Sequence, residues 1–248
     1  MDTSKPDMGK ITKTKSIPFR HILTSPAVWA FILLQVAAYV WDPNLLPLYF
    51  NQSFGTKIEL TGVLAGVPIL IFGAIEPLFA LLGNLLCKYV STTVARKVMA
   101  VTACLCVSGC LFTAAFTSNP VVAACFVAVG FGCSAARAAV ADCNLFDIVP
   151  RYVSVIEGIC RVTCRIVGLT FPLLATALTP HKTLQEWSRV VLIKACVFAA
   201  TGLIFLVFGS GEEQSWAAVP LQGHDGDDIQ QDGSNKKLND EKIPLVVK

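Results

Sequence analysis

The sequence predicts an all-α membrane protein with six transmembrane helices, and both composition and charge placement support that class. Hydrophobic residues make up 54% of the 248 residues, charged residues make up 15%, and the mean hydropathy is +0.62. An ordinary soluble domain has about 25% charged residues. Of the 20 basic and 17 acidic residues, seven lie in residues 1–24 and twelve in residues 210–248. A soluble fold cannot expose so apolar a middle, so we expect a multi-pass protein of the lipid bilayer.

Six apolar segments follow one another along the middle of the chain. Each is near or above the ~20 residues that a helix needs to cross the hydrocarbon core. The segments are 27–50, 60–87, 98–117, 121–141, 153–178 and 189–208, joined by short links rich in Gly, Pro, Asn and Ser. We therefore expect a cytosolic N-terminal segment (1–24), a six-helix transmembrane bundle (25–209) and a polar, disordered cytosolic tail (210–248).

Lysine and arginine residues indicate the orientation, because they accumulate in loops that stay in the cytosol. With the N-terminus in the cytosol, the inner segments carry 13 basic residues and the outer loops carry three. Both termini are therefore expected to be cytosolic. The first outer link contains an N-glycosylation sequon at Asn51, but the sequon lies against the membrane, so its use stays open.

Residues 153–178 carry three charges although they are long and apolar enough to cross a bilayer. Glu157, Arg161 and Arg165 are four residues apart, which places them on one helical face. Arg165 lies about 12 residues into the segment, roughly 18 Å deep at 1.5 Å per residue. A charge near the centre of a membrane costs several kcal/mol or more and usually faces a cavity. Arg165 therefore requires an anion, a partner carboxylate or water.

Four further charges lie inside the apolar segments, namely Asp42, Glu76, Arg137 and Lys194. Segments one, two, four and five are therefore predicted to line a cavity, whereas segments three and six are predicted to face lipid. A second interpretation stays open for most of these charges. Arg137 and Lys194 are about one turn from a membrane surface and can snorkel to it. Asp42 can cap a helix break at Pro43, and Glu157 can simply pair with Arg161.

The ten cysteines and three histidines do not form a pattern typical of a metal or catalytic site. Eight of the cysteines fall inside apolar segments, and no loop carries a Cys-x-x-Cys pair. We interpret them as small residues that pack helices together. His21, His181 and His224 all lie outside the apolar segments. We expect no metal, no cofactor, no enzymatic activity and no nucleic-acid partner.

Six stretches of the sequence form a pattern when they are taken in order. They read IPFRHILTSPAVWA (17–30), LPLYFNQSFG (46–55), TGVLAGVP (61–68), FDIVPRYVSVIEGI (146–159), HKTLQEWSRVVLI (181–193) and FGSGEEQSWA (208–217). In content and separation they resemble solute carrier family 17 of the major facilitator superfamily. The resemblance covers residues 17–217 and corresponds to the C-terminal six-helix half of a twelve-helix fold, with no counterpart here of the N-terminal six helices.

The resemblance implies transport of organic anions or inorganic phosphate by alternating access, coupled to protons or sodium. It implies a plasma, vesicle or lysosomal membrane. Under this interpretation Arg165 and Arg161 bind the small anionic solute, and Glu157 or Glu76 exchanges the coupling ion. The residues that match the family's own motif are Asp147, Pro150, Arg151 and Tyr152.

The chain also departs from the family. The glutamate transporters of the family place an arginine in the first helix of this half, where this chain has Gln35. The loop from Gly83 and Asn84 to Arg96 resembles the superfamily's Gly-x-x-x-Asp loop motif, with Asn in place of Asp. Six helices form only one side of such a transporter's cleft. We therefore expect a homo-oligomer or pairing with another six-helix half. The alternative is a non-transporting interaction or regulatory protein derived from a transporter.

Overall fold

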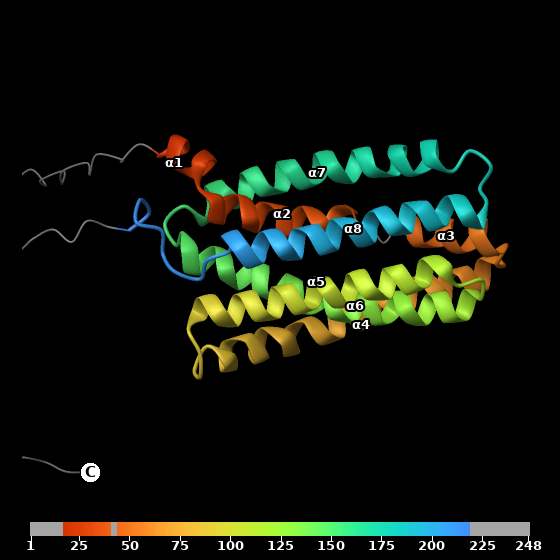
Figure 1. Cartoon of the computed structure of the whole chain (residues 1–248), viewed down its shortest axis with the longest axis horizontal. Coiled ribbons are helices and arrows are strands. Elements are labelled where there is room, and N and C mark those ends of the chain that lie inside the picture. The colour runs from red at the N-terminus through yellow and green to blue at the C-terminus, as the bar shows by residue number, and fades with distance from the viewer. Residues whose placement is uncertain (1–16, 41–43, 219–248) are drawn as a thin grey trace, which may run out of the picture. The chain divides into compact units, whose positions relative to one another are not determined.

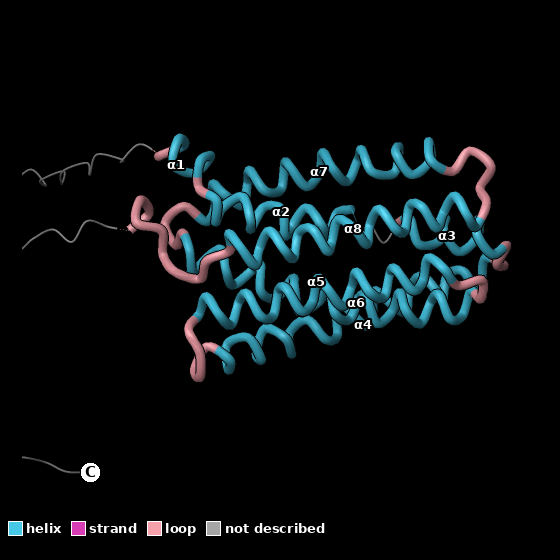
Figure 2. Tube along the Cα trace, viewed as in Figure 1, coloured by secondary structure: helices cyan, strands magenta, loops and turns pink. Residues whose placement is uncertain are grey.

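The computed structural model describes residues 17–40 and 44–218, and the regular structure in these residues is α-helical. The helices are α1 (Phe19–Thr24), α2 (Pro26–Val40), α3 (Leu45–Phe54), α4 (Ile58–Leu86), α5 (Thr92–Phe116), α6 (Pro120–Ile148), α7 (Val153–Leu178) and α8 (Leu184–Phe208). The long helices lie side by side in an up-and-down bundle (Figure 1). Most of the connections between them are short and lie at the two ends of the bundle (Figure 2).

The predicted fold class is confirmed, because each apolar segment corresponds to a helix or a helix pair. Helices α4 to α8 are each long and apolar enough to cross a membrane. Helices α2 and α3 pass the same test only as one broken span, with a bend of 45° between them. The total is therefore five spans, or six when the broken pair counts as one. The predicted cap at Asp42 lies outside the described residues.

Helix α6 is longer than the sequence predicts, and its extra turns change the position of Arg137. The helix continues to Ile148, seven residues beyond the predicted end at 141. The polar residues in this extension have partners: Asn144 donates a hydrogen bond to the Ser210 carbonyl, and Asp147 pairs with Arg96. Arg137 is therefore 11 residues, or about 16 Å, from the helix end. Its side chain is 2% exposed, so the snorkelling interpretation is wrong.

Lys194 is buried for a similar reason. Helix α8 begins at Leu184, five residues before the predicted segment, so Lys194 is ten residues inside the helix. A capping box stabilises the start of α8. The Thr183 hydroxyl accepts a hydrogen bond from the Glu186 backbone N–H, and the Glu186 carboxylate accepts one from the Thr183 backbone N–H. Lys194 is 3% exposed, and its Nζ lies 5.3 Å from the centre of the Phe171 ring. It does not reach the membrane surface by snorkelling.

Small residues let the helices approach closely, as is common inside membranes. At the crossing of α5 and α8, a Cβ added to Gly202 would lie 2.9 Å from Cys104 Cβ. Cys104, Cys160 and Cys164 are buried and pack in this way. Cys106, Cys125 and Cys196 are exposed on the bundle surface instead. The packing interpretation of the cysteines therefore holds for the first three and not for these.

Burial is distributed unevenly over the bundle. In the most apolar windows of α4 and α7, 22% of residues are buried, against 39% in α5, 56% in α6 and 44% in α8. Helix α6 packs on both α4 and α5, whereas α7 packs mainly on α2. Helices α4 and α7 therefore present most of their surface outward, and the exposed surface of α7 includes Arg161.

Candidate functional site

A cavity of about 530 Å³ lies between α2, α4, α6 and α7. The lining residues are Gln35, Ala38, Tyr39, Asn44, Ile69, Phe72, Glu76, Phe131, Ser134, Arg137, Ala138, Asp142 and Arg165. None of these described residues belongs to α5 or α8, in agreement with the prediction that segments one, two, four and five line a cavity. Its volume is in the range of small-molecule sites, and a few charged groups converge on mostly apolar walls.

Arg137 reaches across the cavity wall from α6 to α2. Its Nη1 donates to the Leu34 carbonyl at 3.0 Å and to Gln35 Oε1 at 3.2 Å. Its Nε is buried and has no hydrogen-bond partner among the described residues. No carboxylate in the described part of the chain lies within ion-pair distance of this guanidinium. Arg137 is thus a buried cation whose hydrogen-bonding capacity is only partly used.

Arg165 lies on the opposite wall, on α7. Its guanidinium carbon is 5.5 Å from the centre of the Tyr39 ring on α2, within the range of a cation–π contact. Gly168, one turn further along α7, also packs against Tyr39, since an added Cβ there would lie 3.4 Å from Tyr39 Cδ1. Arg165 makes no ion pair with any described residue. The structure therefore places the predicted substrate-binding Arg165 at the cavity.

Arg161 and Glu157 lie outside the cavity, one turn and two turns before Arg165 on α7. Arg161 Nε donates to Glu157 Oε1 at 2.7 Å, and the Arg161 side chain is 72% exposed. This is the pairing that sequence analysis left open for Glu157. Spacing places the three charges on one face of α7, but only Arg165 lines the cavity.

Two carboxylates line the same cavity as the two arginines. Glu76 was predicted from the sequence, and it comes from α4 just before Pro77. Asp142 comes from the extension of α6 and interacts with the side chain of Gln35. With all four groups ionised, the two positive and two negative charges of the described lining residues cancel. Protonation of either carboxylate leaves a net positive charge.

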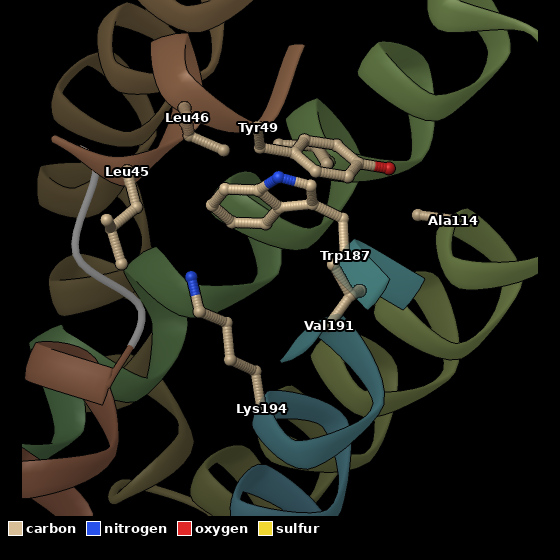
Figure 3. A pocket seen from close by; sticks show the side chains of 8 residues that line it. Leu45, Leu46, Tyr49, Ala114, Trp187, Val191 and Lys194 are labelled. Atoms are coloured by element: carbon tan, nitrogen blue, oxygen red, sulfur yellow. The ribbon is translucent and has the colours of Figure 1, made fainter. Parts of the chain in front are cut away.

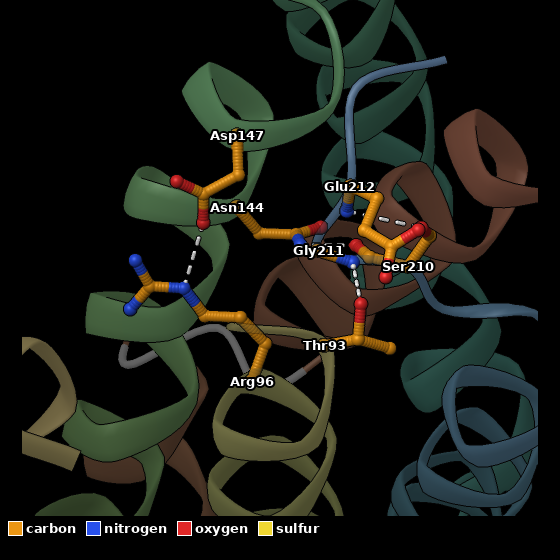
Figure 4. Close-up of polar contacts among 7 residues, drawn as sticks. All are labelled: Thr93, Arg96, Asn144, Asp147, Ser210, Gly211 and Glu212. Carbon is orange, nitrogen blue, oxygen red and sulfur yellow. Dashed lines mark hydrogen bonds and ion pairs between the residues drawn. The ribbon is translucent and has the colours of Figure 1, made fainter. Parts of the chain in front are cut away.

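The residues of the family motif do not line this cavity. They lie at the end of the bundle where the described chain begins and ends, which we call the terminal end. Arg96 Nε on α5 donates to Asp147 Oδ2 on α6 at 2.8 Å (Figure 4). Arg96 is only 6% exposed, so this ion pair joins two helices in a largely buried setting. Pro150 and Arg151 form the turn between α6 and α7.

The segment after α8 crosses the terminal end and is hydrogen-bonded there. Gly211 N–H donates to Thr93 Oγ1 at 3.0 Å (Figure 4), and Gln214 N–H donates to the Ile148 carbonyl at 2.9 Å. Trp216 stacks on Tyr152 of the motif turn, with ring centres 6.0 Å apart. Residues 210–218, which composition assigns to the tail, are therefore packed against α5 and α6.

A second void lies near the opposite end of the bundle, and it is too small for a substrate. It measures about 10 Å³, and Lys194 points into it beneath Trp187 and Leu45 (Figure 3). This volume is about that of one probe sphere of water size. The 530 Å³ cavity is the candidate site because Arg137, Arg165, Glu76 and Asp142 line it.

Comparison with known proteins supports the sequence resemblance. The chain is 33% identical to vesicular glutamate transporter 3 of Danio rerio over 216 residues, which is 85% of this chain and 36% of that protein. It is 32% identical to vesicular glutamate transporter 2.1 of the same species over 220 residues, covering 86% of this chain and 37% of that protein. The chain belongs to solute carrier family 17. It thus spans little more than a third of the length of these family members. No protein-family model matches the chain.

Sequence analysis of this solute carrier family 17 member did not bring together four residues of the site, namely Gln35, Tyr39, Arg137 and Asp142. A signal existed for Arg137 and Asp142. If the helix continues past residue 141, these two residues lie on the same helical face as Ser134 and Ala138. For Gln35 the signal was the resemblance to the family, because Gln35 stands where the glutamate transporters have an arginine. No signal existed for Tyr39, because its role depends on which helices face α2.

Proposed function

We propose that the chain takes part in transport of an organic anion or inorganic phosphate across a membrane by alternating access. The observation that carries the proposal is the cationic Arg165 at a 530 Å³ cavity with mostly apolar walls. In such low-dielectric surroundings, charge-assisted hydrogen bonds from a guanidinium to a carboxylate or phosphate are strong. The relatives are named as glutamate transporters, so glutamate is the first anion to test.

Glu76 is the better candidate of the two predicted coupling residues. It lines the cavity, whereas Glu157 is paired with Arg161 outside it. Because the four charges of the described lining cancel when all are ionised, uptake of a proton by Glu76 would let an anion bind without leaving excess negative charge. This charge balance supports coupling to a proton. Sodium bound by Glu76 and Asp142 would satisfy the same balance.

The transport proposal requires a second half, because the sites of repeat-built transporters lie at the interface between repeats. The spans described here supply one wall of such an interface, and the outward-facing α4 and α7 would contact the other half. The same observation favours a second candidate function, a non-transporting membrane protein that binds a transporter half. The two functions differ in one measurement, uptake of an anion by proteoliposomes.

The test is thermal stabilisation of the purified chain by a panel of anions, followed by uptake. We expect glutamate, inorganic phosphate, sialate or another organic anion to raise the melting temperature in a saturable way. Uptake of the same anion by proteoliposomes supports transport. Binding without uptake, in the presence of any co-purifying partner, favours the interaction protein. If no anion stabilises the chain, the anion-site interpretation is wrong.

We further propose that both termini are cytosolic, in a vesicle, lysosomal or plasma membrane. The 13-to-3 distribution of basic residues supports this orientation. A cysteine introduced in residues 1–15 should be protected from a membrane-impermeant thiol reagent added to intact cells that express the chain at their surface. A cysteine at His181, in the α7–α8 loop, should be labelled. Labelling of the N-terminal cysteine from outside would show that the orientation is the reverse of the one proposed.

A further inference from the structure

Arg137 has the properties of a ligand-binding residue rather than of a residue satisfied by the fold. A guanidinium has five N–H donors, and the two hydrogen bonds of Arg137 both use Nη1. The side chain is 2% exposed, and its Nε has no partner in the described part of the chain. A buried donor left unpaired is costly. The cavity beside it is the space from which a partner can come.

Helix α2 holds Arg137 and Arg165 on successive turns. Gln35 contacts Arg137 and Tyr39 contacts Arg165, and the two α2 residues are four positions apart. Side chains at this spacing have their Cβ atoms about 5–6 Å apart on the same face of a helix. Both arginines line the cavity, from opposite walls on α6 and α7. The arrangement suits a small anion with a carboxylate or phosphate group held between two guanidinium groups.

From these contacts we infer that Arg137 is a second cationic ligand of the transported anion. With Arg165 it forms a two-arginine site along α2, and Gln35 is its positioning residue. The inference rests on the proposed function and assigns to Arg137 the role that sequence analysis gave to Arg161. Glu76 and Asp142 are the other charged groups among the described lining residues, and they balance the arginines when no anion is bound.

Substitution of Gln35 tests this inference without removing a buried charge. Gln35→Glu keeps the side-chain shape and gives Arg137 an internal carboxylate within hydrogen-bond distance. The substitution also removes the amide that faces Asp142, so the melting temperature without anion is measured alongside. We expect the apparent affinity of this variant for the stabilising anion to fall at least tenfold. Arg137→Lys, which keeps the charge but not the bidentate geometry, should weaken the anion response similarly.

Gln52→Glu is the matched control. Gln52 on α3 also accepts a hydrogen bond through Oε1, from Trp187 Nε1 at 3.1 Å, but it does not line the cavity. The control should keep the wild-type response to glutamate and inorganic phosphate. If Gln35→Glu and Arg137→Lys keep that response while Arg165→Ala loses it, Arg137 is structural and the inference alone is wrong. If no anion stabilises the wild type, the proposed function and this inference fail together.

Discussion

Arg165 differs from Arg161 in what surrounds its guanidinium group. Arg161 is paired with Glu157 at 2.7 Å and is mostly exposed, so its charge is already balanced. Arg165 has the face of Tyr39 on one side and the cavity on the other, and no described carboxylate within ion-pair distance. A cation–π contact leaves the edge of the guanidinium, with its N–H donors, available to an anion. The two arginines should therefore respond differently to the same substitution.

We predict that Arg165→Ala lowers the apparent affinity for the stabilising anion at least tenfold, or about 1.4 kcal/mol. Arg165→Lys should recover little, because lysine cannot make a bidentate contact with a carboxylate or phosphate. Arg161→Ala, one turn away on the same helix, should have a smaller effect. The measurement is the dependence of melting temperature on anion concentration. An unchanged response in Arg165→Ala would show that the charges of α7 are structural.

At this scale the sequence predicted individual charges better than their partners. It identified Arg165 and Glu76 as cavity residues because both lie far from the ends of their apolar segments. It could not separate Arg161 from Arg165, because spacing places both on one face and only Tyr39 of another helix distinguishes them. It left Arg137 open between a cavity and the membrane surface, because that choice depended on where α6 ends.

The helices themselves are held together by close contacts whose tolerance can be measured. At the α5–α8 crossing, even a methyl group on Gly202 would lie 2.9 Å from Cys104 Cβ. This Cβ is attached directly to the backbone, so a change of rotamer cannot move it away. Overpacking of this kind costs about 1–3 kcal/mol. We predict that Gly202→Ala lowers the melting temperature of the purified chain. Gly109→Ala on α5, where an added Cβ has nothing within 4 Å, should leave it unchanged.

A compensating substitution shows whether the cause is steric. Cys104→Gly removes the Cβ that the new methyl group would meet, so the double variant Gly202→Ala, Cys104→Gly should be more stable than the sum of the single effects predicts. Additive effects of the two substitutions would contradict the close crossing of α5 and α8.

The Arg96–Asp147 ion pair joins α5 to α6 at the terminal end. Asp147→Asn would leave the Arg96 guanidinium buried with a weaker partner, and a buried polar group that loses its partner costs about 1–3 kcal/mol. We predict a lower melting temperature for this variant and little change in anion affinity, since neither residue lines the cavity. Replacement of both residues, by Arg96→Met and Asp147→Leu, should restore much of the stability. A loss of anion binding in Asp147→Asn would place the motif in the transport site instead.

The spans were predictable because long apolar runs leave few alternatives in a membrane protein. The segment 153–178 matches α7 in both bounds. The start of α8 could have been predicted as well, because Thr183-Leu-Gln-Glu186 has the pattern of a capping box. The end of α6 could not have been predicted from the sequence, because its polar last turns are stabilised by Arg96 and Ser210 from distant parts of the chain.

The whole unit leaves one side poorly buried, and this asymmetry was only indirectly visible in the sequence. Helices α4 and α7 bury about half the fraction of residues that α8 buries. Arg161 lies on α7 with its side chain 72% exposed. Composition predicts that such charges avoid lipid, but it cannot say which surface covers them. The least buried spans, α4 and α7, flank the cavity, so the surface around the cavity is the one left to be covered.

We predict that this surface is covered in the membrane by a second copy of the chain or by another six-helix half. Exposure of Arg161 and Arg165 to hydrocarbon would cost several kcal/mol, so association should persist after reconstitution. Mass photometry of the chain in lipid nanodiscs should therefore give a mass above that of one copy. The double substitution Arg161→Leu, Arg165→Leu removes the two charges and should increase the monomer fraction, whereas Arg189→Leu, near the start of α8, should not. A wild-type chain that stays monomeric and folded in nanodiscs would show that the unit tolerates these charges without a partner.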